Sequence, residues 1–313
     1  MWQADPVSGP LVLLDSASLY FRSFFALPES MTSPDGVPVN AVRGFAGMIA
    51  QIVTERHPAR LVACLDADWR PAFRVEAIPS YKAQRVADPS VNAEEVPDTL
   101  TPQVPIIIDL LDALGIATAQ AAGYEADDVI GTLAHREAAA PVEIITGDRD
   151  LFQCVRDEPT AVRVVYVGRG WSKAEVVGPQ ELAARYGLPA EGLAYADMAV
   201  LRGDPSDGLP GITGIGEKTA AKLITKFGSL AALVDAAAAG SKDVPLKVRE
   251  AFTHDADYLA KAPLVVRVAT DVTIEATGTP ELPHAVDVDR VRQLQERWAL
   301  GSAVDRLLKA LGV

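Results

Sequence analysis

Residues 142–150, VEIITGDRD, place a short apolar strand pattern directly before two aspartates, Asp148 and Asp150. The pattern occurs twice more, because residues 11–15 (LVLLD) end at Asp15 and residues 61–66 (LVACLD) end at Asp66. Such short, mostly apolar runs are typical of strands that are buried on both faces, as in parallel sheets. The carboxyl ends of parallel strands share one edge of a sheet, where ligands bind. We therefore expect acids from remote stretches to meet there.

Helical patterns separate these strands, and this alternation predicts an α/β fold with a parallel, doubly wound sheet. Residues 86–102 have little apolar periodicity and are expected to form a mobile or partly helical excursion. Beyond residue 177 nearly all patterns are helical. We therefore expect an α/β unit over residues 1–177, with an excursion at about 82–102, and a mostly helical unit over 178–313. Helices are predicted over 16–27, 41–54, 104–114, 124–138, 179–186, 193–201, 217–227, 229–239 and 246–261, and from 288 and 303; further strands are predicted over 116–120 and 162–167, with a short β-rich return over 264–268.

Acidic residues follow the predicted strands, begin the helix after residue 124 and recur in the turn GDPSDGLPG, residues 203–211. Singly they have ordinary explanations, because an aspartate that caps a helix or lies in its first turn stabilises it by about 1 kcal/mol. Gathered at one edge, they would repel one another unless cations were bound between them. Carboxylate oxygens suit Mg²⁺ or Mn²⁺ better than zinc. The candidate metal ligands are Asp15, Asp66, Glu125, Asp127, Asp128, Asp148, Asp150, Asp204 and Asp207.

The chain has 313 residues and a net charge of −13, which at first argues against a nucleic-acid partner. The average is misleading if the acids are concentrated: without the nine candidates, 33 of the 42 acids remain against 29 basic residues. The two cysteines form no CxxC pattern, and the apolar stretch near the N-terminus lacks the features of a signal or membrane segment. We expect a cytoplasmic protein with no membrane association.

A glycine-rich turn, residues 211–216 (GITGIG), opens a helical pattern. Exposed amide groups at such a helix start bind phosphate. A nucleotide-binding P-loop is rejected, because Glu217 separates the last glycine from Lys218. Lysines at 218, 222 and 226 share one face of the helix, which is either a solvated surface or a track for a DNA backbone. Residues 81–85 (YKAQR) add cations that could stabilise phosphate charge beside a metal site.

These segments together resemble the 5′-nuclease family, which comprises the 5′→3′ exonuclease domain of bacterial DNA polymerase I, its free-standing relatives and, more distantly, flap endonucleases. The matching stretches are LVLLDSASLYFRSFFALP, YKAQR, GYEADDVIGTLA, ITGDRDLFQ and GDPSDGLPGITGIGEKTAAKL. The resemblance implies a PIN-like or resolvase-like nuclease domain followed by a helical domain with a helix-three-turn-helix at about 203–227. It also implies structure-specific 5′→3′ exonuclease and flap endonuclease activity on DNA in replication and repair.

By the same resemblance, the nine acids bind two or more Mg²⁺ or Mn²⁺ ions, and Lys82 and Arg85 are the catalytic basic pair. A potassium ion is implied at the helix-three-turn-helix. The implied partners are DNA with 5′ ends, flaps or nicks, a separate DNA polymerase and a ligase, and the protein is expected to be a monomer. The expected DNA-binding residues are Phe21, Arg22, Arg74, Tyr81, Gly211, Gly214, Gly216, Lys218, Thr219 and Lys222.

Two positions depart from the family pattern. Phe21 replaces a frequent tyrosine, which keeps an aromatic face for base stacking but removes a hydroxyl. Gly208 replaces a frequent asparagine, which removes a side-chain hydrogen bond near the acids. Neither change removes a candidate metal ligand.

Two other functions compete with this hypothesis. Asp66-Ala67-Asp68 at a strand end is compatible with a phosphatase of the haloacid-dehalogenase type, in which the first aspartate is a covalent nucleophile. A trapped phosphoaspartate analogue and DNA-independent turnover would favour that function. The chain could also be a non-catalytic module that binds DNA junctions, which tight binding without metal-dependent cleavage would reveal.

Overall fold

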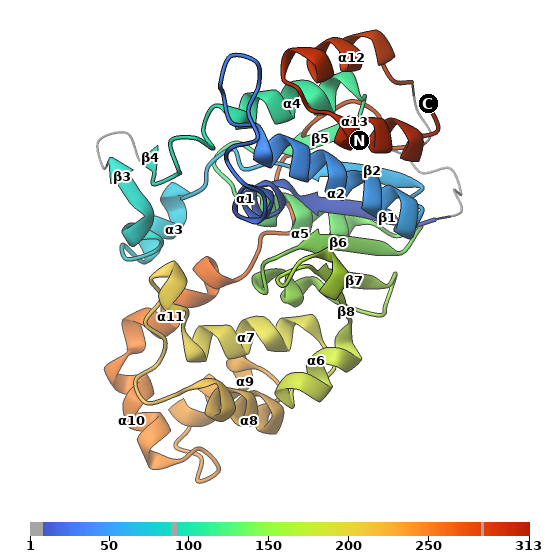
Figure 1. Ribbon diagram of the computed structural model, residues 1–313. Helices are drawn as coiled ribbons and strands as arrows, with labels where there is room; N and C mark the ends of the chain where they lie inside the picture. The colour runs from blue at the N-terminus through green and yellow to red at the C-terminus, as the bar shows by residue number, and fades with distance from the viewer. Residues whose placement is uncertain (1–8, 89–92, 283–284) are drawn as a thin grey trace.

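The computed structural model describes residues 9–88, 93–282 and 285–313 and contains a seven-stranded sheet at its centre (Figure 1). The strand order is β8-β7-β6-β1-β2-β5-β9. The five inner strands are parallel, and β8 and β9 are antiparallel at the two edges. The predicted parallel sheet is therefore confirmed for its interior. The strands are β1 (Leu11–Asp15), β2 (Arg60–Cys64), β5 (Ala117–Gln120), β6 (Val142–Thr146), β7 (Val162–Tyr166), β8 (Glu175–Val177) and β9 (Glu275–Thr277).

The central strand β1 fixes where the acids lie. It pairs with β2 and β6 in one register, because Leu11 lies opposite both Arg60 and Val142. Asp15, the last residue of β1, lies opposite Cys64, and Asp66 follows two residues later. The ends of these three adjacent strands therefore form one edge of the sheet, as the sequence predicts.

Helices cover both faces of the sheet, which explains why β1 is apolar at every position before Asp15. Leu11 and Leu13 pack on the side of α5, whereas Val12 and Leu14 pack on the side of α2, α4 and α13. A strand buried on both faces needs apolar residues at successive positions. The covering helices are α1 (Ser16–Ala26), α2 (Asn40–Arg56), α4 (Gln103–Ala113), α5 (Ala126–Arg136), α12 (Val288–Arg297) and α13 (Ser302–Ala310).

A group of helices lies against the β8 side of the sheet (Figure 1). The predicted helix over 246–261 is two helices, because Asp255 leaves helical geometry and accepts a hydrogen bond from the backbone of Thr213. The predicted β-rich return over 264–268 is wrong: α11 continues to Val266, since burial of Val265 outweighs the strand preference of its neighbours. The group comprises α6 (Pro179–Tyr186), α7 (Gly192–Arg202), α8 (Glu217–Phe227), α9 (Leu230–Ala238), α10 (Leu246–His254) and α11 (Ala256–Val266).

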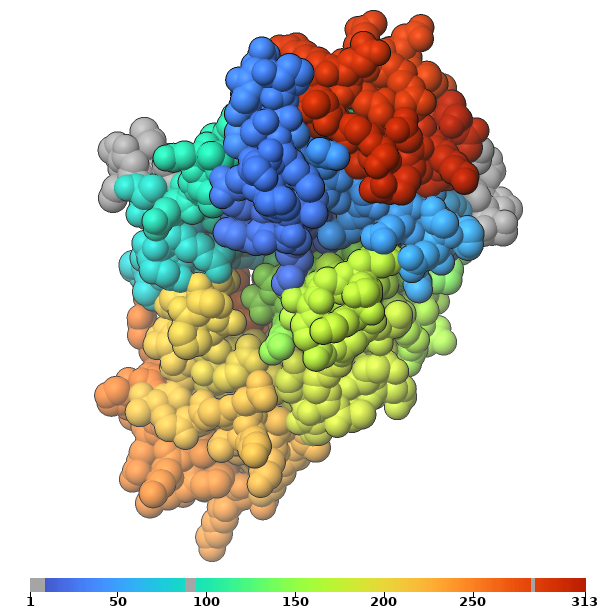
Figure 2. Space-filling view, in the orientation of Figure 1, coloured from blue at the N-terminus to red at the C-terminus, as the bar shows by residue number. Residues whose placement is uncertain are grey.

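The predicted second unit, residues 178–313, does not pack as one body. Strand β9 hydrogen-bonds to β5, and α12 and α13 lie against α4 and α2. Figure 2 shows these C-terminal helices in contact with the N-terminal part of the chain. The physical reason is the apolar stripe of α13, whose Val304, Leu307 and Leu308 are buried on α2. The chain therefore returns to the α/β layer after α11.

The predicted excursion at about 82–102 also differs from expectation, since its described part is not helical beyond the short turn η1. Residues 86–88 (β3) and 93–94 (β4) form a small antiparallel pair, and residues 89–92 lie outside the described part of the chain. The short elements nearby are α3 (Ala72–Ala77), η1 (Ala83–Arg85), β3 (Val86–Asp88) and β4 (Ala93–Glu94); the other 3₁₀ turns are η2 (Asp150–Cys154), η3 (Trp171–Lys173) and η4 (Pro205–Asp207). Within the described ranges no helix is long and apolar enough to cross a lipid bilayer.

Candidate metal centre

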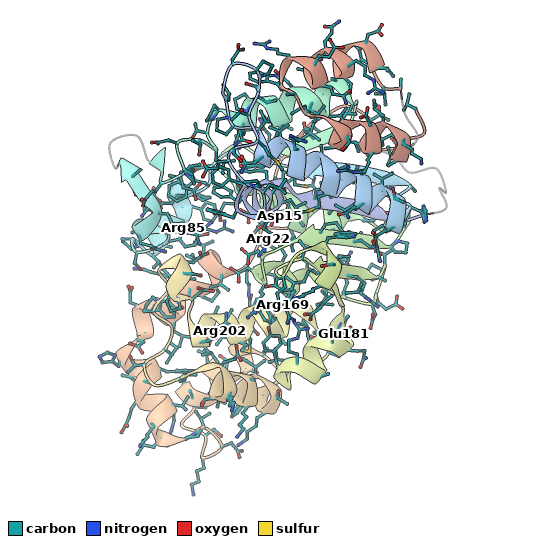
Figure 3. All side chains as sticks on the ribbon, in the orientation of Figure 1. Asp15, Arg22, Arg85, Arg169, Glu181 and Arg202 are labelled. Carbon is teal, nitrogen blue, oxygen red and sulfur yellow. The ribbon has the colours of Figure 1, made fainter. Side chains whose placement is uncertain are left out.

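Two adjoining cavities, of about 360 and 40 Å³, lie between the sheet edge and the helical group. They share Lys82, Arg85, Glu125, Asp127 and Asp148 as lining residues. Figure 3 labels Asp15 and Arg85, which lie on opposite sides of this region, and Arg202 on the helical side. Of the nine predicted metal ligands, those that line one or both cavities are Asp15, Asp66, Glu125, Asp127, Asp148, Asp150, Asp204 and Asp207.

Asp15 is fixed by contacts that join two strands. It caps α1 by accepting from the backbone of Ser18 at 3.2 Å, and its other oxygen accepts from Thr146 Oγ1 at 2.6 Å. The same Thr146 hydroxyl accepts from the backbone N–H of Asp148 at 2.8 Å. Thr146 therefore links the acid of β1 to the acids after β6. Sequence reasoning missed this residue, because a threonine at a strand end has no distinctive signal.

Asp66 and the start of α5 bring the second group of acids into the site. Asp66 accepts from the backbone N–H of Ala126 at 2.7 Å, which joins the end of β2 to the first turn of α5. Glu125 precedes α5 in a capping box with Asp128, and Asp127 lies in the first turn. The helix start that the sequence predicts as a possible structural cap is therefore also the wall of the cavity.

The remaining acids come from two tight turns. The backbone N–H of Asp150 donates to Asp148 Oδ1 at 2.9 Å, and Asp204 begins η4 by accepting from the N–H of Ser206 at 2.8 Å. Asp204 and Leu209 exchange backbone hydrogen bonds, which closes the turn and presents Asp207 to the cavity. The segment therefore forms the expected turn, and the same turn places its acids at the cavity, where their role as metal ligands stays a prediction.

The cluster carries more negative charge than the protein itself neutralises. Burial, together with Asp66 and Asp148, raises the pKa of Asp15 to about 7. Burial is also the main cause of the raised pKa values of Asp127 and Asp150, and neighbouring carboxylates add to both. Bound cations would relieve this repulsion. An all-oxygen donor set of this charge fits Mg²⁺ or Mn²⁺.

The carboxylates line the cavity walls and do not form a closed cage. Within residues 9–88, 93–282 and 285–313, no three histidine, cysteine or acidic side chains already stand close enough to bind one ion. The donor chemistry therefore fits divalent ions, and binding them requires the side chains to move toward a common point.

Asp128 is a correction to the predicted ligand set. It is fully buried and lines neither cavity. Its Oδ1 accepts from Arg74 at 2.7 Å and from the N–H of Ala269 at 2.8 Å, and its Oδ2 accepts from the N–H of Glu125. With its oxygens held in this way, Asp128 organises the start of α5 and is not a candidate metal ligand.

Arg74 and Tyr81 are corrections to the predicted DNA contacts. They are only 2% and 4% exposed and lie at the wall of the 40 Å³ cavity, so neither is on the outer surface of the protein. Arg74 forms ion pairs with Glu125 and Asp128, and the Tyr81 hydroxyl donates to Glu125 Oε2 at 2.7 Å. Arginine stems and tyrosine rings pack well inside a protein when their polar ends are paired, and the sequence alone does not distinguish that from an exposed position.

The predicted basic pair does reach the site. Lys82 Nζ forms an ion pair with Glu125, and Arg85 Nη2 lies 2.6 Å from Asp207 Oδ1. The backbone N–H of Lys82 also donates to the carbonyl of Asp207 at 2.9 Å. The segment that follows α3 is therefore tied to the acidic turn of residues 204–208.

Gly208 explains how closely these two segments approach. It has a φ of +71°, and a Cβ built there would lie 1.9 Å from the carbonyl oxygen of Ser80. The Ser80 hydroxyl donates to the Gly208 carbonyl at 2.7 Å. An asparagine at this position would collide with Ser80, so the departure from the family pattern matches the local packing of this chain.

The glycine turn and α8 present a polar face away from the core. Gly214, Gly216, Lys218, Thr219 and Lys222 are exposed, whereas Ala220, Leu223 and Ile224 are buried. Gly211 is buried, and its φ of +71° lets it pack against the carbonyl of Arg202. The predicted amphipathic helix is confirmed, and Lys218 and Lys222 are exposed on it, whereas Lys226 pairs with Asp243.

Phe21 and Arg22 lie on α1 beside the acid-lined cavities. Phe21 lines the 360 Å³ cavity together with Asp15. Arg22 donates to the carbonyls of Gly168 at 2.8 Å and Gly147 at 3.3 Å. These contacts favour a role for Arg22 in fixing the loop that carries Asp148.

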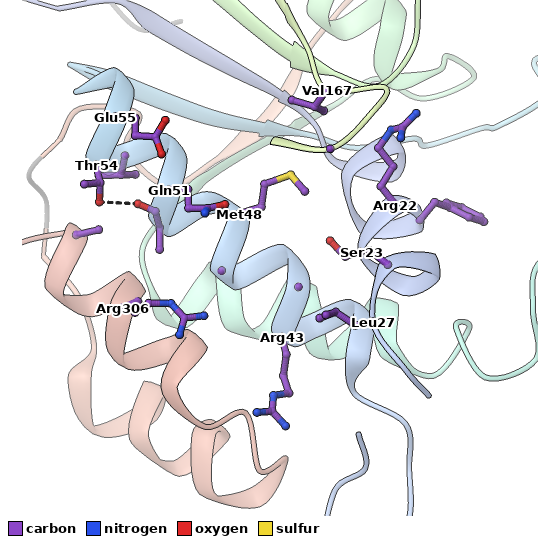
Figure 4. Close-up of a pocket in the computed structure, with 18 of the residues that line it drawn as sticks. Arg22, Ser23, Leu27, Arg43, Met48, Gln51, Thr54, Glu55, Val167 and Arg306 are labelled. Atoms are coloured by element: carbon purple, nitrogen blue, oxygen red, sulfur yellow. Dashed lines mark hydrogen bonds between the residues drawn. The ribbon is translucent and has the colours of Figure 1, made fainter. Parts of the chain in front are cut away.

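A third cavity, about 1270 Å³, lies between α1, α2, α13 and the loop after β7 (Figure 4). Glu55 is the one acid among the described residues that line it, so it is not a candidate metal site. Phe21 lines both this cavity and the catalytic cavity, so the two are neighbours. Its basic lining residues are Arg22, Arg43, Arg169, Arg306 and Lys309, with His57.

Other residues of the site were also not anticipated. Ser18 Oγ accepts from the backbone of Gly147 at 3.0 Å, and Glu94 and Glu95 from β4 and the residue after it line the 360 Å³ cavity. Burial raises the pKa of Glu94. Conversely, Asp68, which suggested a phosphatase, accepts from the N–H of Arg70 and lines neither cavity. The phosphatase hypothesis therefore loses its second aspartate.

The raised pKa of Asp15 predicts an unusual pH dependence of stability. In the unfolded chain this group titrates near 3.8, so its favourable contribution is complete below that pH and is lost as the pH rises through about 7. We expect the metal-free protein to have a lower Tm at pH 8 than at pH 5.5, by several degrees, because about 1 kcal/mol shifts Tm by about 2–4 °C in domains of some 150–250 residues.

Differential scanning calorimetry with and without Mg²⁺ measures this effect. Mg²⁺ is expected to raise Tm more at pH 8 than at pH 5.5, and Asp15→Asn is expected to reduce the pH dependence. An equal Tm at both pH values in the metal-free protein would contradict the prediction.

Comparison with known proteins identifies the family. Residues 10–187 match the model of the 5′-3′ exonuclease N-terminal resolvase-like domain, and residues 191–284 match that of the 5′-3′ exonuclease C-terminal SAM fold. The chain therefore belongs to the 5′-3′ exonuclease family. It is 54% identical to a 5′-3′ exonuclease of Mycobacterium tuberculosis, over 96% of this chain and 98% of that protein. A 5′-3′ exonuclease of Streptomyces coelicolor is 53% identical, over 96% and 99%.

Longer relatives and solved structures agree with this assignment. The chain is 39% identical to DNA polymerase I of Mycobacterium leprae, and the match spans 98% of this chain but 32% of the polymerase. One similar solved structure is a bacteriophage T5 flap endonuclease in a pseudo-enzyme-product complex with DNA and metal ions. It superposes with a TM-score of 0.65 at 17% identity, over 97% of this chain and 100% of that one. At that identity the likeness supports the fold, which is an α/β nuclease layer with a helical second unit.

Proposed function

We propose that this protein is a structure-specific 5′ nuclease that hydrolyses DNA phosphodiesters at 5′ ends and flaps, leaving a 5′-phosphate and a 3′-hydroxyl. The observation that carries the proposal is the gathering of eight predicted metal ligands from five separate segments around two adjoining cavities, with Lys82 and Arg85 in the shared wall. Structural stability does not require that arrangement, because like charges so gathered are destabilising without cations. Membership of the 5′-3′ exonuclease family supports the same activity.

These eight predicted ligands would hold the divalent ions, Mg²⁺ or Mn²⁺. Such ions bind the oxygens of a scissile phosphate, lower the pKa of water and stabilise the leaving oxygen. The protein's own cations act beside them: Lys82 and Arg85 neutralise charge that develops on the phosphate. To do so they must exchange their partners Glu125 and Asp207 for phosphate oxygens.

The glycine turn and α8 would bind the backbone of duplex DNA. The exposed Gly214 and Gly216 at the helix start, with the exposed Lys218 and Lys222, form a surface of the right chemistry for phosphates. We assign Gly214, Gly216 and Thr219 to the same contact, with a potassium ion at the turn carbonyls, and the buried Gly211 to the shape of the turn. Because these groups reach phosphates and not base edges, little dependence on base sequence is expected.

The basic cavity of Figure 4 would be a second DNA-binding surface, on the other side of α1 from the acid-lined cavities. Arg43, Arg306 and Lys309 line this cavity, and in the described part of the chain they make no ion pair. This cavity is therefore locally basic in a protein whose net charge is −13. The exposed Phe25 and the nearby Phe21 offer aromatic faces for stacking. We propose that one arm of the DNA contacts α8 and that the arm on the other side of the cleavage point lies along this basic surface.

Charge removal from this surface gives a testable result. The triple variant Arg43→Ala, Arg306→Ala, Lys309→Ala is expected to bind a double-flap substrate at least tenfold more weakly, with the slope of log K against log salt reduced by about 2 to 3. Binding to a duplex with only a 5′ overhang should be nearly unchanged. The control is Arg290→Ala, because Arg290 is a cation on α12 that is already paired with Asp112 of α4. Equal losses of affinity on both substrates would contradict the assignment.

Product mapping tests the proposed activity directly. A 5′-labelled double flap and a blunt duplex of the same sequence are incubated with Mg²⁺ or Mn²⁺, and the cleavage positions are read on a sequencing gel. We expect metal-dependent cleavage near the base of the flap and slower attack on the blunt end. Binding without metal-dependent cleavage would instead support a non-catalytic junction module.

The finer biological setting is also a proposal. We place the enzyme in the cytoplasm, in keeping with two free cysteines, one of them buried. It would act as a monomer in replication and repair, and a polymerase and a ligase would fill and seal the gaps it leaves. The similarity to DNA polymerase I supports the link to synthesis.

A further inference from the structure

Arg74 is a buried cation at the back of the catalytic cavity. Its guanidinium forms ion pairs with Glu125 and with Asp128, and it lies 5.2 Å from the ring centre of Phe73 and 5.9 Å from that of Tyr81. It is 2% exposed, so these neighbours fix it on several sides. A buried arginine of this kind can act only through the residues that it contacts.

The two oxygens of Glu125 have different partners. Oε2 accepts from Arg74 Nη1 and from the Tyr81 hydroxyl, and both donors are buried. Oε1 accepts from Lys82 Nζ, and Lys82 lines both catalytic cavities. One oxygen is thus held by the protein interior, while the other is paired with a side chain of the cavity wall.

Arg74 also joins the segment of Lys82 to the start of α5. It lies on α3, a few residues before Tyr81 and Lys82, whereas Glu125 and Asp128 begin α5. Asp128 in turn accepts from the N–H of Ala269, beyond α11. Because its two terminal nitrogens each contact a different carboxylate, the planar guanidinium fixes Glu125 relative to Asp128, which a single ammonium group does not.

We propose that Arg74 is a positioning residue: by holding Oε2 of Glu125, it turns Oε1 toward the cavity as a ligand for a divalent cation, which takes the place of Lys82 Nζ there. The inference rests on the proposed function. It goes beyond that function because it assigns to a buried arginine the geometry of one metal ligand and the release of Lys82 toward a phosphate.

The competing explanation is that Arg74 only balances the buried charge of Glu125 and Asp128. Removing Arg74 alone would leave those charges unpaired and destabilise the fold, whatever its role. The informative variant therefore removes one negative charge together with the positive one. Arg74→Met with Asp128→Asn does this, and the asparagine oxygen can still accept from the N–H of Ala269.

The test measures Mn²⁺ binding to the full chain without DNA by isothermal titration calorimetry, with Tm recorded in parallel. Asp128→Asn alone is expected to bind Mn²⁺ within about twofold of the unmodified protein. The double variant is expected to bind at least tenfold more weakly, since loss of a group that orients a metal ligand typically costs about 10–100-fold in affinity. Affinity of the double variant equal to that of Asp128→Asn would overturn the proposal.

Two further results complete the test. If the double variant does not fold, Arg74→Lys is measured instead, because a lysine keeps the charge but contacts one carboxylate at a time. A loss of Mn²⁺ affinity of at least threefold supports the positioning role. An unchanged Mn²⁺ affinity overturns it. If the unmodified protein binds no Mn²⁺, the proposed function fails, and this inference fails with it. Tight Mn²⁺ binding that does not respond to Arg74 would overturn the inference alone.

Discussion

Asp148→Asn is expected to lower the rate of flap cleavage by at least about a thousandfold while raising the Tm of the metal-free protein. Asp148 lines both catalytic cavities, and its charge contributes to the raised pKa values of Asp15, Asp127 and Asp150. A carboxylate that helps to hold a metal supports several kcal/mol of transition-state stabilisation, and about 1.4 kcal/mol corresponds to a tenfold change in rate. Removing its charge also relieves repulsion among the remaining acids.

The opposite signs of the two effects make this prediction specific. Single-turnover cleavage of a labelled flap at saturating enzyme measures the first effect, and calorimetry without metal measures the second. Asp157→Asn is the matched control, because Asp157 pairs with Arg163 on the surface and lines neither cavity. Undiminished cleavage by Asp148→Asn would defeat the metal-site assignment.

Lys82→Met is expected to lower the cleavage rate by about 10²–10³-fold, the usual loss when a group that stabilises transition-state charge is removed. Mn²⁺ affinity in the absence of DNA is expected to remain equal or to increase, because Lys82 Nζ occupies Glu125 Oε1 in the metal-free protein. Methionine keeps the length of the side chain without its charge.

Comparison of rates and affinities separates the roles of the two kinds of residue. Lys226→Met serves as the control, since Lys226 pairs with Asp243 far along α8. A Lys82→Met variant that cleaves normally would exclude Lys82 from the reaction. A variant that loses Mn²⁺ binding would indicate that Lys82 organises the acids and does not compete with the ion.

Much of the sheet and the convergence of the acids could be predicted from the sequence. Strands β1, β2 and β6 are short apolar runs ended by acids, and the shared edge of parallel strands then follows from topology. The helix α8 could be predicted for a similar local reason, because its lysine face and apolar stripe have the helical period.

Burial within the site could not be predicted, since it depends on tertiary packing. Arg74, Tyr81 and Asp128 look like exposed polar residues in the sequence, yet each is buried by its ion pair or hydrogen bond with the start of α5. Strand β9 has the same origin: its three residues are all exposed, so no apolar pattern marks them, and pairing with β5 alone makes them a strand. Local signals carry no information about such partners.

Anomalous diffraction from a crystal of this protein with Mn²⁺ and a DNA flap tests the central claim most directly. The account predicts manganese peaks in the catalytic cavity, with oxygens of Glu125, Asp127 or Asp148 bound at about 2.0–2.3 Å and a DNA phosphate beside them. Lys82 should then have left Glu125 for the phosphate. Manganese absent from the cavity, with these carboxylates turned apart while DNA is bound, would contradict the account.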